Sequence, residues 1–321
     1  MEILGDSNAT LKDLTRIVEA EIMEPRTMLH PLICSEVESA DEAYIKIPVQ
    51  TRVPFPTLFD GERAPTGTEV NVVQQYNKAT YALTMDYGSD LMKESKAYTF
   101  SEKTQEGTLS AKIFPNWNLT KNVIIGNVNA YDGKAFYANN HLWANTGTNT
   151  INNTVSKTGQ TPTALMTDLN TAFAQMGTFL DNQGRLLNPL LAWGSKNLII
   201  HCPLALEMAF RQVIFSSIVP IAIPGTASSA MAATAWKDLG LDGIAQIYAD
   251  GYLDAASTTT WYLHYVGMPQ RPFVFSESYG LIAKALGFGS EWETNHNQVR
   301  IAMKHRFVEG VYRFDRSIKV A

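Results

Sequence analysis

The stretch from residue 41 to residue 85 constrains the fold of this 321-residue chain more than any other part of it. Residues 44–53 (YIKIPVQTRV) alternate apolar and polar side chains, which is typical of a β-strand, and residues 70–85 (VNVVQQYNKATYALTM) are again β-like. Between them lies FPTLFDGERAPTGTE, which contains turn formers such as Asp60-Gly61. The simplest interpretation is a long β-hairpin with a polar tip. Because a two-stranded ribbon is only marginally stable alone in water, we expect it to pack on another surface, such as a neighbouring subunit.

Three helices are expected outside this excursion in the first 180 residues. Residues 11–24 (LKDLTRIVEAEIME) place apolar side chains at helical spacing. Residues 99–126 have helical character, and Pro115 should kink or restart that helix. Pro162 opens a further helix over residues 162–179, with Asp168 expected at its solvent side.

Short strands are expected in the second half of the chain. NLIIHC (residues 197–202) has the length and composition of a strand, and a helix should follow it over residues 203–215, which is α/β-like locally. The tract at residues 139–158, rich in Asn and Thr, is interpreted as a polar loop. Further short strands are expected at residues 244–248, 261–265 and 272–275.

The last fifty residues are expected to close the fold with strands. Residues 299–307 alternate, so one face should be apolar and the other basic. Gly310 should break this run, after which apolar residues resume, so we expect a closing β-hairpin or a pair of bent strands. The basic face carries the most concentrated positive charge in the chain: Arg300, Lys304 and Arg306, continued by Arg313 and Arg316. It could contact phosphate or the acidic residues of a neighbour, and a solvated or interface face is the favoured interpretation.

Composition excludes several classes of protein. The 26 Lys and Arg residues against 31 Asp and Glu give a net charge of −5, which is too mild for a protein that wraps nucleic acid or binds a membrane surface. Hydrophobic residues make up 45% of the chain, which excludes wholesale disorder. The two cysteines, Cys34 and Cys202, fit neither a disulfide framework nor a metal motif, so we expect a reducing compartment. We expect neither an export signal nor insertion into a membrane.

The sequence lacks the common motifs for catalysis and cofactor binding. The Gly133-Lys134 pair lacks the other residues of a phosphate-binding loop, and no G-x-S-x-G nucleophile turn occurs. The six histidines are never spaced to place two ligands on one helix face. We therefore expect no catalytic residue, no cofactor and no metal.

A few isolated groups remain as weaker candidates. His201 and Cys202 are adjacent in a strand and should point to opposite faces, so a buried core pair is favoured over a metal site. His141 is interpreted as a loop side chain, with a site residue as the alternative. Four carboxylates near turns are interpreted as turn or cap residues, ahead of a calcium or acid-base role: Asp238, Asp242, Asp250 and Asp254.

The order of these elements resembles the HK-97-like phage major capsid fold, and residues 79–141 are similar to the Mu-like phage major head subunit family. The residues that carry this resemblance are KATYALTMDY, then EGTLSAKIFPNWNLTKNVIIG, then YDGKAFYANNH. The tail, with WYLH, RPFVF and NQVRIAMKHRFVEGVYRF, also resembles that family's closing segment.

The resemblance implies an α+β architecture in several parts. Residues 1–40 would be an N-terminal arm, and residues 41–85 an extended β-hairpin loop. Residues 86–161 and 271–321 would form a peripheral domain with a long spine helix, and residues 162–270 an α/β axial domain that meets its copies around symmetry axes.

The implied function is that of the major capsid protein of a tailed bacteriophage or prophage. Such a chain would assemble as hexamers and pentamers into an icosahedral shell in the bacterial host cytoplasm, and in the virion it would enclose double-stranded DNA, which it contacts non-specifically. The implied partners are further copies of the chain, a portal, a separate scaffold and decoration proteins, and no membrane. The chain would not be an enzyme, and we expect no covalent cross-link between subunits.

The tip of the excursion and the basic strand face are the candidate contacts between subunits. We expect the apolar residues of the tip to contribute more than its charges, because an ion pair at an exposed rim contributes only about 0–1 kcal/mol. The candidates are Phe55, Leu58, Phe59, Asp60, Glu62 and Arg63 in the tip, and Arg300, Lys304 and Arg306 on the strand.

Two alternatives stay open. An encapsulin-type compartment shares the fold but holds cargo enzymes instead of a genome. An α/β hydrolase or ligand-binding enzyme would account for the strand and helix of residues 197–215, although the nucleophile turn is missing.

Overall fold

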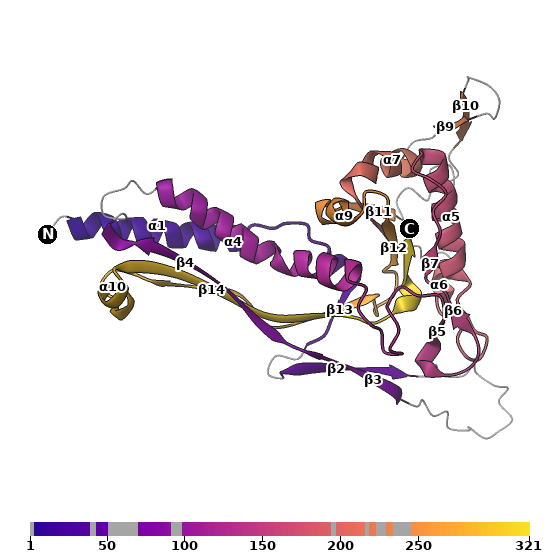
Figure 1. Cartoon of the computed structure of the whole chain (residues 1–321), viewed down its shortest axis with the longest axis horizontal. Coiled ribbons are helices and arrows are strands. Elements are labelled where there is room, and N and C mark those ends of the chain that lie inside the picture. Colours follow the sequence, from indigo (N-terminus) through magenta and orange to yellow (C-terminus); the bar gives the residue numbers. More distant parts are fainter. Residues whose placement is uncertain are drawn as a thin grey trace.

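A long arm and a compact body make up the molecule (Figure 1). The computed structural model describes residues 3–38, 43–50, 70–90, 98–193, 197–215, 218–222, 229–233 and 245–321. The arm combines two long helices with a long sheet, and the body is built on a second sheet. Both contain β and α elements, as an α+β architecture requires.

The sheet of the arm has four strands in the order β1-β13-β14-β4. β13 (Phe273–Leu286) and β14 (Gln298–Val311) are antiparallel and are joined through α10 (Glu291–His296). β4 (Ala79–Gly88) pairs with β14, and β1 (Cys34–Glu36) pairs in parallel with the first residues of β13. The alternation expected in residues 299–307 is confirmed, with its apolar side chains buried: Val299, Ile301, Met303 and Phe307.

Two helices cover one face of this sheet. α1 (Ile3–Met23) contains the helix expected at residues 11–24, and its Leu14 and Val18 pack on Met85 and Ile301. α4 (Tyr98–Asn118) lies beside α1. Gly107 permits α4 to lie close to the sheet, because a Cβ atom there would lie 2.4 Å from the sulfur of Met85 in β4.

Of the two outcomes expected at Pro115, a kink or a restart of the long helix, the restart does not occur. α4 continues through it to Asn118, and the chain then forms a π-helix, η1 (Leu119–Ile125). Proline removes one helical hydrogen bond. The ring of the adjacent Phe114 packs at 4.7 Å from Tyr81 and 6.1 Å from Phe307, measured between centroids. These ring contacts hold the helix against the sheet next to the proline.

The sheet of the body has five strands in the order β11-β8-β12-β15-β7. β8 (Leu198–Cys202) is followed by α7 (Leu204–Phe215), which confirms the expected strand and helix. The other strands are β11 (Ala245–Ala249), β12 (Trp261–Tyr265), β15 (Ser317–Val320) and β7 (Thr154–Val155). α5 (Pro162–Gly177) packs with α7, β12 and β15. β8 is parallel to β11 but antiparallel to β12, so the sheet is mixed.

The closing strands do not form a hairpin. β14 passes through Gly310 and ends at Val311, and a 3-10 turn, η3 (Phe314–Arg316), then leads into β15 in the other sheet. The last residues of the chain therefore tie the arm to the body.

The tract at residues 139–158 is more ordered than a polar loop. It forms β5 (His141–Leu142), the 3-10 turn η2 (Trp143–Asn145), β6 (Thr150–Ile151) and β7. The reason is the fully buried Asn153, whose amide donates to the carbonyls of Phe136 and Phe314 and accepts from the amide of Ala138.

Asp168 is buried, not at the solvent side of α5. Its carboxylate accepts two hydrogen bonds of 3.0 Å from the amide of Thr158 and one of 2.8 Å from the Thr158 hydroxyl. These three bonds compensate for the desolvation of the charge.

The remaining elements are short. They are α2 (His30–Ile33), α6 (Pro189–Trp193), α9 (Gly251–Ala256), β9 (Ile218–Ala222) and β10 (Ser229–Ala233). In the described part of the chain, no helix is long and apolar enough to cross a membrane.

Candidate assembly surfaces

The β-hairpin is shorter than expected. β2 (Tyr44–Gln50) pairs with β3 (Val70–Asn77), and the chain turns away at Lys78, so that the second half of the expected strand, β4, joins the sheet of the arm. The tip between β2 and β3 falls outside the described residues, and with it the candidates Phe55, Leu58, Phe59, Asp60, Glu62 and Arg63.

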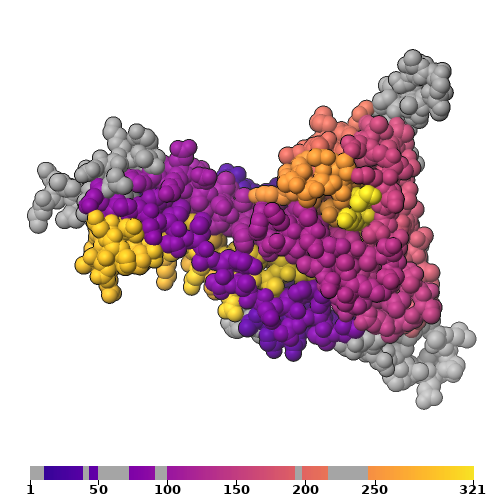
Figure 2. Space-filling view, viewed as in Figure 1, coloured from indigo at the N-terminus to yellow at the C-terminus, as the bar shows by residue number. Residues whose placement is uncertain are grey.

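The described part of the hairpin is firmly attached at its root. Ile45 and Ile47 are buried against Val274 of β13. Tyr76 lies against the backbone of β14 at Gly310, where a Cβ atom would come within 2.5 Å of the Tyr76 ring. Figure 2 shows the hairpin lying at the base of the arm beside the body. The sheet therefore provides the surface on which the two-stranded ribbon rests.

The basic residues Arg300, Lys304 and Arg306 lie on the face of the sheet opposite α1 and α4, because side chains alternate along β14. Arg300 makes two hydrogen bonds, of 2.6 and 2.7 Å, to the Asp86 carboxylate, and its guanidinium lies 3.4 Å from the Trp292 ring centroid. Arg300 is thus used within the chain.

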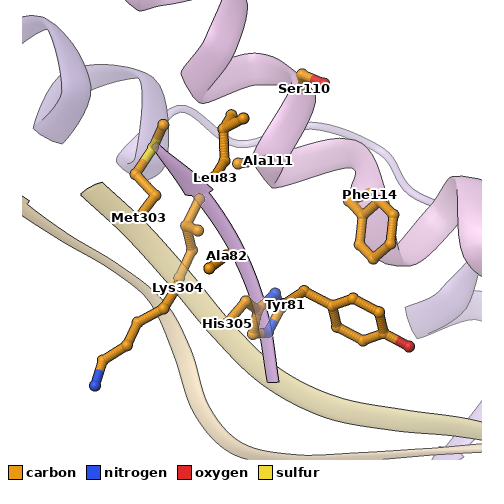
Figure 3. Close-up of a pocket in the computed structure, with 10 residues that line it drawn as sticks. Tyr81, Ala82, Leu83, Ser110, Ala111, Phe114, Met303, Lys304 and His305 are labelled. Atoms are coloured by element: carbon orange, nitrogen blue, oxygen red, sulfur yellow. The ribbon is translucent and has the colours of Figure 1, made fainter. Parts of the chain in front are cut away.

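Lys304 and Arg306 occupy the same face nearer the middle of the strand. The Lys304 ammonium lies 5.1 Å from the Tyr279 ring centroid and points away from α4 (Figure 3). Arg306 pairs with Tyr279 across the sheet. The row is therefore a mixed surface of cations and aromatic rings on one side of the arm.

Arg313 and Arg316 do not continue this row. Both are buried at the junction of the arm and the body, where Arg313 makes two hydrogen bonds of 2.8 Å to the Asp315 carboxylate. The Arg313 guanidinium also lies 4.3 Å from the Trp143 ring centroid. The strand ends at Val311, so the face alternation on which the prediction rested stops before these residues.

The sequence did not indicate an exposed apolar stripe on α7. Leu204, Met208 and Phe215 are 54%, 75% and 43% exposed and follow one another at helical spacing. Tyr252 of α9 is exposed next to them. The signal in the sequence is that LALEMAFRQVIF has more apolar residues than one buried face needs.

A cavity of about 320 Å³ lies between α4 and the sheet (Figure 3). Its walls are mostly apolar, and its lining residues are Tyr81, Ala82, Leu83, Ser110, Ala111, Phe114, Leu281, Met303, Lys304 and His305. Within the described residues, no group of three or more His, Cys, Asp or Glu side chains lies close enough to hold a metal ion.

His201 and Cys202 form a buried core pair, as expected. Burial lowers the pKa of His201, so the ring is neutral and its Nε2 donates to Asp250 at 3.1 Å. Burial acts to raise the pKa of Asp250, but hydrogen bonds from His201 and Thr120 outweigh it and leave that pKa below its usual value. This network joins η1 to the body.

The expected roles of the carboxylates hold where the structure describes them. Asp250 caps α9 by accepting from the amide of Tyr252, and Asp254 accepts from the amides of Leu204 and Ala205 at the start of α7. Asp238 and Asp242 fall outside the described residues.

His141 is not a loop side chain. It is fully buried, bonds to Asp132 at 2.7 Å and stacks on Phe314 with 4.2 Å between ring centroids. It therefore helps to hold the junction of the arm and the body.

Comparison with known proteins gives likeness in structure alone. No family model matches the sequence, and a search of curated proteins finds no relative. The capsid structure of the cyanophage P-SCSP1u is similar at a TM-score of 0.55 and 11% identity, over 92% of this chain and 88% of that chain. A virus-like particle from Pyrococcus furiosus is similar at a TM-score of 0.55 and 7% identity, over 97% of this chain and 98% of that chain.

A third structure, of Mycobacterium phage Patience, is similar at a TM-score of 0.51 and 11% identity, over 98% of this chain and 86% of that chain. At such identities the likeness shows the fold. It extends over nearly the full length of the chains on both sides, so it includes the arm, the hairpin and the body together. The chain therefore has the α+β fold of HK-97-like capsid proteins.

Proposed function

We propose that the chain is the major capsid protein of a tailed bacteriophage or prophage, and that it assembles as hexamers and pentamers into an icosahedral shell around double-stranded DNA. The observation that carries this proposal is that the structure resembles a capsid subunit over nearly its full length. The similarity to the cyanophage capsid chain covers 92% of this chain and 88% of that chain. A structural subunit of this kind is not an enzyme. It would be assembled in the bacterial cytoplasm and reside in the virion.

Within this fold, the Mu-like head subunits are the proposed subfamily. Support comes from the sequence at residues 79–141, which spans β4, α4, η1 and the turn at Tyr131-Asp132-Gly133. In the structure this stretch links the arm to the body.

The two proposed domains correspond to the two sheets. The arm, with α4 as its spine, would be the peripheral domain, and the body around α5 and α7 the axial domain. The pairing of β4 with β14 supports placing residues 79–88 in the peripheral domain, so the proposed extended loop covers residues 41–77. Residues 1–40 remain the proposed N-terminal segment, which is called the N-terminal arm in capsid proteins of this fold. In this structure its helix α1 packs on the four-stranded sheet of its own chain.

The contacts between subunits are proposed on two surfaces. The tip of the hairpin, through Phe55, Leu58, Phe59, Asp60, Glu62 and Arg63, would lie over a neighbouring copy. The basic face with Arg300, Lys304 and Arg306 would meet acidic groups of another copy. The exposed stripe on α7 supports a third contact, because an apolar row such as Leu204, Met208 and Phe215 gains stability when a partner covers it.

The proposed partners beyond the chain itself are a portal, a separate scaffold and decoration proteins, with DNA contacted non-specifically. No covalent cross-link is proposed.

A second candidate is a protein compartment that holds enzymes. The observation that favours it is the likeness to the Pyrococcus furiosus virus-like particle, which spans 97% of this chain and 98% of that one. The content of purified particles separates the two: nuclease-protected DNA supports the phage capsid, and a co-purifying enzyme supports the compartment. The hydrolase alternative is less favoured, because the nucleophile turn is missing from the sequence and the similar structures are those of shell proteins.

Size-exclusion chromatography of the recombinant chain over a range of concentrations tests the proposal. A capsid subunit should shift from monomer to capsomers or larger assemblies as concentration rises. A chain that stays monomeric at every concentration, alone and with a candidate scaffold, would contradict it.

A further inference from the structure

We propose that Glu309, Asn118 and Asn122 form a proton-dependent latch that holds the C-terminal end of α4 against β14. The latch lies within one chain, so it does not depend on whether the chain builds a shell. It spans the point at which α4 ends and the π-helix η1 begins, since Asn118 is the last residue of α4 and Asn122 lies inside η1.

The three side chains form a continuous chain of hydrogen bonds. Oε2 of Glu309 is 2.8 Å from Nδ2 of Asn118, and Oδ1 of Asn118 is 2.7 Å from Nδ2 of Asn122. Glu309 is only 8% exposed, and its second oxygen, Oε1, is buried without a hydrogen-bond partner. A buried carboxylate normally has both oxygens paired, so this geometry suits a neutral acid better than a charged one.

Among the residues that the structure describes, no positively charged group shifts the pKa of Glu309. Burial and, to a smaller extent, the charge of Glu309 raise the pKa of the Cys34 thiol in β1 and of the Tyr81 hydroxyl in β4. Glu36 of β1 is on the same face of the sheet and is itself an acid. The Lys121 ammonium of η1 does not contribute to the pKa shift of Glu309; it lies 5.8 Å from the centroid of the Trp117 ring.

The nearest histidines do not neutralise Glu309 either. His30 of α2 stacks on Phe275, the residue paired with Glu309, and burial lowers the pKa of His30 to about 4. His305 of β14 lies 3.6 Å from Glu277 of β13, measured between Nε2 and Oε1. In the described part of the chain, burial and the Asn118 bond are the influences on Glu309, and burial raises its pKa from 4.5 to about 8.

The protonated acid can donate its proton by reversing the chain of bonds, which leaves only a neutral carbonyl oxygen, Oε1, without a partner. Amide nitrogen and oxygen are assigned from the hydrogen-bond network, and both asparagines can be turned over in place. The Glu309 hydroxyl then donates to Oδ1 of Asn118, and Nδ2 of Asn118 donates to Oδ1 of Asn122. When Glu309 ionises, it can only accept, and a buried negative charge is left beside the end of α4. Loss of the proton therefore opposes the contact between α4 and β14.

Hydrogen exchange measured by mass spectrometry on the full-length protein tests the latch. After division by the intrinsic rate, protection of amides at residues 114–126 should fall by about 10-fold between pH 7 and pH 9.5, since opening becomes about tenfold easier for each pH unit below the folded-state pKa of about 8 and no longer changes above it. α5 (Pro162–Gly177) is the internal reference and should keep its protection.

Two variants keep the side chain neutral at every pH, Glu309→Gln and Glu309→Leu, so that failure of one to fold leaves the other. In either variant the loss of protection at pH 9.5 should disappear. Glu277→Gln is the matched control, because it removes a carboxylate from the same sheet without touching the latch, and it should behave as the wild type. Unchanged protection in the wild type at pH 9.5, or an equal loss in the Glu309 variants, would overturn the proposal.

Discussion

The hydroxyl of Tyr76 makes two hydrogen bonds to one residue, Val311: it donates to the carbonyl at 2.6 Å and accepts from the amide at 3.0 Å. Tyr76 is on β3 of the hairpin and Val311 is the last residue of β14, so a single side chain joins the hairpin to this strand of the arm. Gly310 leaves the space that the ring occupies. This contact fixes the direction in which the hairpin leaves the subunit.

Replacing Tyr76 by Phe should destabilise the protein by about 1–3 kcal/mol, because the amide and carbonyl of Val311 lose their partner while the ring still shields them from water. Urea unfolding followed by fluorescence measures the change. Tyr44→Phe, at the first residue of β2, is the control and should have a much smaller effect. Equal stability of Y76F and the wild type would show that water replaces the hydroxyl.

Met208→Asp should weaken self-assembly by tenfold or more and leave the stability of the monomer almost unchanged. Met208 is 75% exposed on α7, so the carboxylate is harmless in the free chain but is desolvated when another copy covers the stripe. Ala174→Asp places the same charge on an exposed position of α5 and should assemble normally. Light scattering during assembly gives the comparison, and normal assembly of M208D would remove α7 from the interface.

Lys304→Glu should slow assembly at low salt with little change in the unfolding temperature, whereas Arg300→Ala should lower the unfolding temperature first. The difference follows from Arg300 being bound to Asp86 within the chain, while Lys304 points outward from the sheet. The effect of K304E should shrink in about 0.5 M salt, since screening weakens exposed charge interactions. Assembly of K304E at wild-type rates in low salt would argue against this face as a contact.

Stability should fall between about pH 5 and pH 8 through Glu309. Its pKa is raised to about 8 in the folded chain from 4.5, so the folded state holds a proton that the unfolded state has released across this window. The contribution is complete below pH 4.5 and is lost as the pH rises through 8, by roughly 4–5 kcal/mol for a shift of this size. Urea titrations of wild type and E309Q from pH 5 to pH 9 measure it. The difference between the two should change with pH, and a constant difference would mean that Glu309 is ionised throughout.

Sequence reasoning succeeded where one face of one element is buried. The apolar periodicity of α1 and α5, and the strand and helix of β8 and α7, reflect burial against a single neighbour, which the spacing of residues encodes directly. The architecture came from the resemblance of residues 79–141 to a capsid family, because no motif specifies how these elements are arranged.

Sequence reasoning failed where the environment of a residue depends on which distant part of the chain it contacts. Residues 70–85 are β-like in sequence throughout, yet Lys78 separates a strand of the hairpin from a strand of the arm, and the sequence pattern cannot tell which partner a strand will pair with. Asp168 and Arg313 were placed at the surface because they are charged. Both are buried with partners, Thr158 and Asp315, whose positions depend on the completed fold. For the tip of the hairpin, the expected contacts remain predictions.

Negative-stain electron microscopy of the purified chain, alone and with a candidate scaffold, is the most direct test of the central claim. The account predicts closed shells, or tubes and rings of five and six subunits, and predicts that M208D gives fewer of them than A174D. Fields that show only single, unassembled subunits under all conditions, with the hairpin and sheet intact by circular dichroism, would contradict the assignment as a capsid subunit.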